Sequence, residues 1–183
     1  KQLALLSADA IPVRHEYLLS GNDYYYRSRY GEIGQKLKPA VFISFDNKGG
    51  ELGKPLPAGI VRVYTMDSKG AAQFVGEDSI NHTAKNETIK LRLGEAFDIT
   101  ADRKQTSYKK LGDTTTETSY RIDLRNAKDE AVTVRVQEPF FGDWEITQEN
   151  HRSTKESSST AVWNIAIPAG GSAVLEYTAR VKW

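Results

Sequence analysis

The strongest constraint on the fold is an alternation of apolar and polar side chains with a period of two residues. The clearest case is the stretch 119–146, SYRIDLRNAKDEAVTVRVQEPFFGDWEI, in which two such runs follow one another. This is the period of a strand with one buried face, and the polar segment 126–129 between the runs predicts a hairpin. The apolar positions of the two runs are Tyr120, Ile122, Leu124, Val132, Val134 and Val136.

Runs of the same kind recur along the whole chain and are separated by segments rich in Gly, Pro, Asn and Asp. The longest such segment is 47–59, NKGGELGKPLPAG. The pattern predicts an all-β fold of two abutting antiparallel β-sandwiches. Residues 1–94 would form an N-terminal β-sandwich portion, and residues 95–183 an immunoglobulin-like β-sandwich. One extended β-sandwich is the alternative.

Composition excludes several classes of function. The formal net charge of +1 provides no field suited to nucleic acid. The chain has no cysteine, which rules out disulfides, thiol catalysis and thiolate metal sites. No apolar run approaches the roughly 20 residues that a transmembrane helix needs. The sequence begins at Lys1 inside a strand-like run, so we expect that an upstream segment is missing from it.

The best candidate for a binding surface is the aromatic segment 24–30, YYYRSRY. A strand here would place Tyr24, Tyr26 and Tyr30 on one face and Arg27 and Arg29 on the other. An exposed row of aromatic rings can stack on sugars, and the arginines can hold a carboxylate. The alternative, which the sequence favours, is that the tyrosines pack against a neighbouring strand because aromatic residues are common in strands.

A second cluster, Glu77, Asp78 and His82, contains residue types that ligate metals or share a proton. No second histidine stands at ligand spacing, and we interpret the three as solvated charges. We predict no catalytic residue, no metal ligand and no cofactor, and hence a protein that is not an enzyme.

Several long runs of the sequence carry a resemblance to a known family. They are GKPLPAGIVRVY at 53–64, FVGEDSINHT at 74–83, LRLGEAFDITADRKQT at 91–106, VRVQEPFFGDWEI at 134–146 and IPAGGSAVLEYTARVKW at 167–183. These runs resemble the C-terminal domain of unknown function of bacterial mucoidy-inhibitor-like exported proteins. The resemblance covers residues 40–183 well and the first forty more loosely. It implies a β-rich domain in the periplasm or cell envelope, preceded by a signal peptide and an N-terminal portion, and it transfers no catalytic residue.

The leading hypothesis is therefore a non-catalytic interaction or structural module of the bacterial cell envelope. The alternative is a polysaccharide- or glycan-binding module that uses the tyrosine row. The expected partner is an unknown protein or an envelope polysaccharide, and a metal-assisted hydrolase at Glu77, Asp78 and His82 is the third and least favoured hypothesis.

Overall fold

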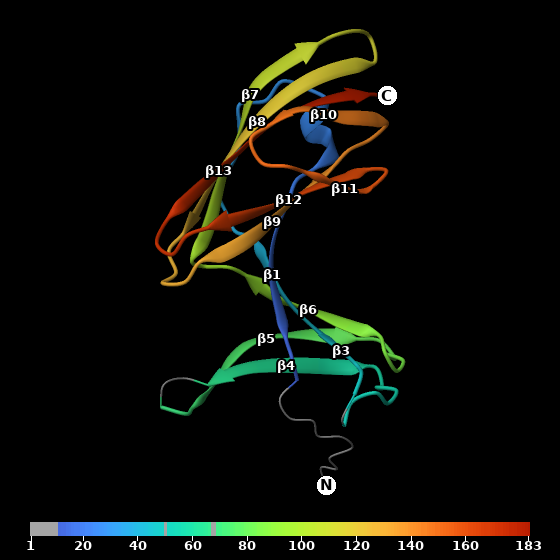
Figure 1. The fold of residues 1–183 in the computed structure, drawn as a ribbon, viewed down its shortest axis with the longest axis vertical. Coiled ribbons are helices and arrows are strands. Elements are labelled where there is room, and N and C mark those ends of the chain that lie inside the picture. Colours follow the sequence, from blue (N-terminus) through green and yellow to red (C-terminus); the bar gives the residue numbers. More distant parts are fainter. Residues whose placement is uncertain (1–10, 50, 67–68) are drawn as a thin grey trace. The chain divides into compact units, whose positions relative to one another are not determined.

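The protein is built from β-strands and one short helical turn, as a computed structural model describes it for residues 11–49, 51–66 and 69–183 (Figure 1). The all-β prediction is confirmed. No helix in these ranges is both long and apolar enough to cross a membrane. The strand-like run predicted at the start of the chain lies largely outside the described residues.

The elements follow one another along the chain with turns and loops between them. They are β1 Arg14–Ser20, the 3₁₀ helix η1 Asp23–Tyr26, β2 Glu32–Leu37, β3 Ala40–Asp46, β4 Gly59–Met66, β5 Ala72–Ile80, β6 Thr88–Glu95, β7 Ile99–Lys110, β8 Thr115–Asn126, β9 Val132–Pro139, β10 Asp143–Glu149, β11 Thr154–Ser157, β12 Thr160–Ile167 and β13 Ser172–Lys182.

The chain forms two compact units. Unit 1 comprises the residues up to Glu16 together with Ala40–Gly94, and unit 2 comprises Tyr17–Pro39 together with Glu95–Trp183. Residues 17–39 thus lie in unit 2, whereas the sequence analysis placed them in the N-terminal portion. The reason is hydrogen bonding at long range: residues 17–20 of β1 pair in parallel with β9, and β2 pairs with β7.

Unit 1 encloses a small apolar core between β3 and β6 on one side and the hairpin β4–β5 on the other. Ile43, Ile89 and Leu91 are buried in it. The partly buried side chains that pack against these three include Val61 and Val63 of β4. The core therefore fixes one face of β4–β5 and leaves the other face outward.

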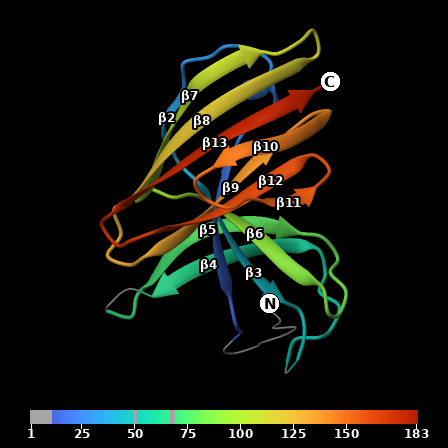
Figure 2. The same cartoon turned by 45° about the horizontal axis from the view of Figure 1, so that its top comes forward.

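Unit 2 is a sandwich of two sheets. One sheet has the order β11-β12-β9-β1, and the other has the order β10-β13-β8-β7-β2, whose strands run side by side in Figure 2. Trp163 of β12 and Tyr177 of β13 stack across the interior with ring centroids 4.6 Å apart. Aliphatic side chains of both sheets, among them Ile122, Ile165 and Leu175, are also buried in this core.

The predicted hairpin at 119–146 is wrong, although the predicted buried faces are confirmed. The six apolar positions of the two runs are buried, but β8 pairs with β7 and β13, while β9 pairs with β1 and β12. Segment 126–132 thus crosses from one sheet to the other. Asn126 fixes this crossing, because its amide donates to the carbonyl groups of Glu130 and Pro168. Periodicity identifies the buried face of a strand but not its hydrogen-bonding partner.

A buried polar cluster joins the two sheets of unit 2. Arg103 of β7 donates from Nη1 to Oε1 of Glu138 in β9 over 2.5 Å, and both side chains are fully buried. The second carboxylate oxygen of Glu138 accepts a hydrogen bond from Tyr26 Oη at 3.0 Å, and Tyr26 Oη lies 2.8 Å from Tyr177 Oη. We call these four residues the Arg103–Glu138 cluster. Because a buried charge is costly unless it is paired and hydrogen-bonded, the four residues depend on one another.

Gly21 leaves the space that the Glu138 carboxylate occupies. A Cβ atom added to Gly21 would lie 1.9 Å from Oε2 of Glu138. The backbone of Gly21 cannot easily retreat, because its N–H donates to the carbonyl of Gln137 at 2.8 Å. Glycine is therefore required here by close approach.

We expect Gly21→Ala to lower the free energy of unfolding by about 2–3 kcal/mol, because the added methyl group must displace the Glu138 carboxylate from its partners. The measurement is urea denaturation. The matched control is Gly31→Ala, since no heavy atom lies within 4 Å of a Cβ added at Gly31. Equal stability of the two variants would contradict this role of Gly21.

Candidate functional site

The aromatic segment 24–30 is not a strand. Residues 23–26 form the 3₁₀ helix η1, whose N-cap Asn22 accepts a hydrogen bond from the Tyr24 backbone N–H at 3.3 Å. With about three residues per turn, successive side chains point in different directions instead of alternating between two faces. The predicted row of exposed tyrosines is therefore wrong: Tyr24 is 46% exposed, but Tyr26 is completely buried.

Tyr26 belongs to the core of unit 2. Its ring lies 4.5 Å from the ring of Phe140 and 5.6 Å from that of Tyr120, measured between centroids. Burial raises the pKa of the Tyr26 phenol well above its usual value, and the negative charge of Glu138 raises it further. Burial and the charge of Glu138 likewise raise the pKa of Tyr177. Tyr26 cannot contact a ligand from solvent.

The other predicted binding residues remain accessible to different degrees. Arg27 pairs with Asp23 at 2.8 Å, and its guanidinium lies 4.2 Å from the centre of the Phe141 ring. Arg29 is exposed and forms no ion pair with any described residue. Tyr30 is half-buried, and its ring centroid lies 6.1 Å from that of Tyr24. Of the predicted set, the structure thus keeps Tyr24, Arg29 and Tyr30 available to solvent without a competing ion pair.

Arg29 and Tyr30 line a polar depression of about 260 Å³ at β7, which we call the tyrosine depression. Tyr108, in the same lining, is held in place because its hydroxyl donates to the carbonyl of Arg27 at 3.1 Å. The backbone N–H of Tyr30 donates to Oε1 of Gln105 at 2.6 Å. Thr106 also borders this depression.

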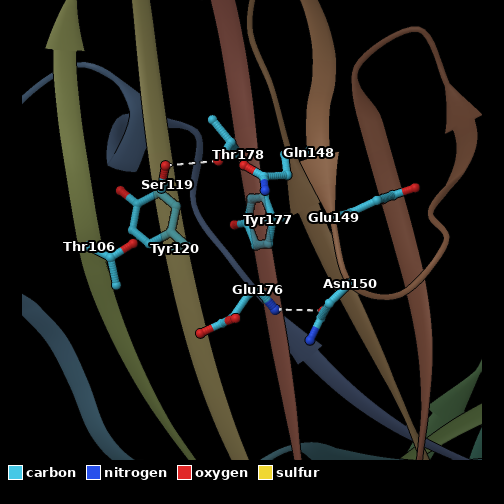
Figure 3. Close-up of a pocket in the computed structure, with 9 residues that line it drawn as sticks. All are labelled: Thr106, Ser119, Tyr120, Gln148, Glu149, Asn150, Glu176, Tyr177 and Thr178. Carbon is cyan, nitrogen blue, oxygen red and sulfur yellow. Dashed lines mark hydrogen bonds between the residues drawn. The ribbon is translucent and has the colours of Figure 1, made fainter.

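A larger depression of about 360 Å³ lies on the outer face of the sheet β10-β13-β8-β7 (Figure 3). Ser119 of β8 is paired with Thr178 of β13, which is in turn paired with Gln148 of β10. We call Thr106 of β7 and these three residues the polar row. The row faces outward, because Tyr120, next to Ser119 in β8, is buried and successive side chains of a strand point to opposite faces.

The sequence analysis did not find the polar row. The polar row is made of residues from four strands. In the sequence each of them is an ordinary polar residue on the solvent face of its strand. Only the register between the strands brings them together. The alternation that marks the buried neighbours is the one local signal that these residues point outward.

The side chains of Glu77, Asp78 and His82 are engaged with separate partners. Glu77 pairs with Arg62 at 2.9 Å, and Nδ1 of His82 accepts a hydrogen bond from the backbone N–H of Ala58 at 3.3 Å. Hydrogen bonds from the backbone N–H groups of Arg92 and Ser79 lower the pKa of Asp78. Within the described ranges, no group of three or more His, Cys, Asp or Glu residues is placed to hold a metal ion.

Unit 1 presents an apolar surface on the outward face of β4–β5. Tyr64 pairs with Phe74 across the hairpin, and their rings make an edge contact with centroids 5.6 Å apart. Met66 extends the surface along β4, and Ile60 lies on the same face beyond the ion pair of Arg62 with Glu77, since residues two apart in a strand share a face. More than half of each of these four side chains is exposed. We call the four residues the apolar face.

Comparison of the chain with models of protein families, with curated proteins and with solved structures gave no match.

The buried tyrosines predict the response of the protein to alkali. A phenol whose pKa is raised by folding contributes stability that is complete below its unfolded value of about 10 and is lost as the pH rises toward the folded value. We therefore expect Tyr26 and Tyr177 to stay protonated above pH ~10 and to ionise only as the protein unfolds. ¹³Cζ-tyrosine NMR resolves each residue during such a titration, and circular dichroism follows unfolding. Ionisation of Tyr26 near pH ~10 in folded protein would contradict its buried environment.

Proposed function

We propose that this chain is a non-catalytic interaction module of the bacterial cell envelope, and that the apolar face of β4–β5 holds a protein partner. The observation that carries the proposal is the gathering of Ile60, Tyr64, Met66 and Phe74, each more than half exposed, on one side of a two-stranded sheet. Contiguous apolar surface that stays exposed is typical of a protein–protein interaction site.

The chemistry of this surface favours a protein over other partners. Its centre is aromatic and thioether-bearing, which are the side-chain types enriched in protein interfaces. Arg62, paired with Glu77 at 2.9 Å, supplies a charged pair on the same hairpin. An apolar centre beside charged groups is the usual anatomy of an interface between proteins.

The surface is also held rigid from below. Val61 and Val63 alternate with the outward residues of β4 and pack against the buried Ile43, Ile89 and Leu91. A rigid surface loses little conformational entropy on binding, so more of the contact energy is retained as affinity.

A non-catalytic role is favoured because the side chains considered for hydrolysis, Glu77, Asp78 and His82, already hold partners within the protein. We also propose that the protein lies in the periplasm or cell envelope and that its partner is an unidentified envelope protein. Both proposals follow from the resemblance to exported proteins. We propose in addition that unit 2 is immunoglobulin-like, and its two packed sheets support this.

The alternative is a glycan-binding module. The hypothesis that a row of exposed tyrosines binds a glycan does not hold for Tyr26, because this side chain is buried in the core. Tyr24, Arg29 and Tyr30 stay at least partly accessible, so glycan binding is compatible with the structure only at a site of different shape.

To test the protein partner, a photo-reactive phenylalanine analogue is placed at Met66 and, as the control, at the exposed Thr114 of unit 2. We expect one envelope protein to cross-link at position 66 and not at position 114. Once purified, that protein should bind Tyr64→Ser/Phe74→Ser at least roughly 30-fold more weakly, the equivalent of about 2 kcal/mol for central aromatic residues. Equal melting temperatures of variant and wild type would show that the variant is folded.

Three outcomes contradict the proposal. One is equal cross-linking at both positions. Another is unchanged affinity of the Tyr64→Ser/Phe74→Ser variant. The third is a cross-link at position 66 to lipid or to a second copy of the chain alone, which would assign the apolar face to a membrane or to self-association.

A further inference from the structure

Two depressions of unit 2 adjoin at β7. The polar row lines the larger one, and Arg29, Tyr30 and Tyr108 line the tyrosine depression. Thr106 borders both. The two depressions together, which we call the track, lead from Arg29 and Tyr30 past Thr106 and then across the outer face of β7, β8, β13 and β10.

Thr106 occupies the junction because of an irregularity in β7. Gln105 pairs with Tyr120 and Ser107 pairs with Ser119, so Thr106 is the extra residue of a β-bulge. Bulges redirect side chains and are frequent beside functional sites. Thr106 is exposed, and its hydroxyl forms no hydrogen bond to any described residue. This hydroxyl can therefore form a hydrogen bond with a ligand in either depression.

The polar row carries hydrogen-bonding capacity that the protein leaves unused. Ser119 and Thr178 share one hydrogen bond at 2.8 Å, and each hydroxyl supplies one donor and two acceptor positions. One hydroxyl proton and several lone pairs thus remain. The Gln148 carboxamide makes no hydrogen bond to any described residue and adds two donors and an acceptor. Such uncharged groups match the hydroxyls of a sugar.

Most charges beside the row are paired, and the carboxylate of Glu149, which also lines the larger depression, accepts hydrogen bonds from the Ser153 backbone N–H and from Trp163 Nε1, each at 3.0 Å. On one side, Arg180 contacts Glu117 and Glu145, both at 2.9 Å. On the other, Arg121 contacts Asp123 and Glu176, both at 2.8 Å. The row between them is neutral. Arg29, at the far end of the track, has no ion pair with any described residue, so it is the group that would attract an anion.

The wall of the larger depression is fixed in advance. Asn150 donates to the carbonyl of Val174 at 2.9 Å and accepts from the backbone N–H of Glu176 at 2.8 Å, the second bond being drawn in Figure 3. These bonds tie the end of β10 to β13. A ligand therefore meets polar groups that need little reordering, which favours binding.

We propose that this track binds a short saccharide chain that carries a carboxylate. Arg29 holds the carboxylate, and the polar row hydrogen-bonds the hydroxyls of the following residues. This site is separate from the apolar face of unit 1 and does not depend on it.

The test uses isothermal titration calorimetry with two probes of equal length, tetragalacturonic acid and maltotetraose. We expect the wild type to bind the acidic probe about tenfold more tightly than the neutral one. Arg29→Gln should remove that preference. Thr106→Ala should lower the affinity for both probes about fivefold, because Thr106 lies at the junction of the two depressions. Two-dimensional NMR of the wild type should show the largest shifts at Thr106, Ser119 and Thr178.

The controls are Arg152→Gln and Thr114→Ala, which change exposed residues of unit 2 outside the track. Both should bind like the wild type. The proposal is overturned if neither probe binds at millimolar concentration, if Arg152→Gln weakens binding as much as Arg29→Gln, or if the NMR shifts fall outside the track. Equal affinity of the wild type for the two probes would overturn the assignment of Arg29 to a carboxylate.

Discussion

The ion pair between Arg103 and Glu138 is the interaction on which the architecture of unit 2 depends. Packed sheets lie about 10 Å apart, so two long side chains from facing strands meet in the middle of the core. Burial alone would lower the pKa of Arg103, but the charge of Glu138, the neighbouring Tyr177 and Tyr26 and the hydrogen bond to Glu138 together raise it above its usual value. Since an unpaired charge at this depth is strongly destabilising, the sheets must keep the spacing and register that join the two groups.

The same pair determines where segment 21–30 lies. Glu138 needs the space beside Gly21 and the hydroxyl of Tyr26, and both belong to this segment. Buried polar groups of the sheet hold the rest: Thr116 donates to the carbonyl of Tyr26 at 3.0 Å, and Gln105 donates to that of Ser28 at 3.0 Å. Arg29 and Tyr30 follow directly along the chain. The proposed saccharide track thus has a fixed end, because these hydrogen bonds anchor the segment that leads to Arg29.

How much of this could be predicted from the sequence depends on the range of the interaction. The faces of β8 and β9 were predictable, because alternation is a local property of a strand. Their separation into different sheets was not, because pairing is decided by distant strands such as β12 and β13. Tyr26 was misassigned because Asn22 begins a 3₁₀ helix there, and the polar row was missed because only strand register assembles it. The partners of Glu77 and His82 were not predictable either, because Arg62 and Ala58 are brought to them by the pairing of distant segments.

The most direct test of the account is a double-mutant cycle on the buried pair, measured by equilibrium urea denaturation. Arg103→Met and Glu138→Leu should each lower the free energy of unfolding by about 3–5 kcal/mol, because each leaves an unpaired buried charge. The double variant should recover most of that loss, since it removes both charges and keeps apolar volume. Single losses below about 1 kcal/mol, or losses that simply add in the double variant, would contradict the central role of this pair.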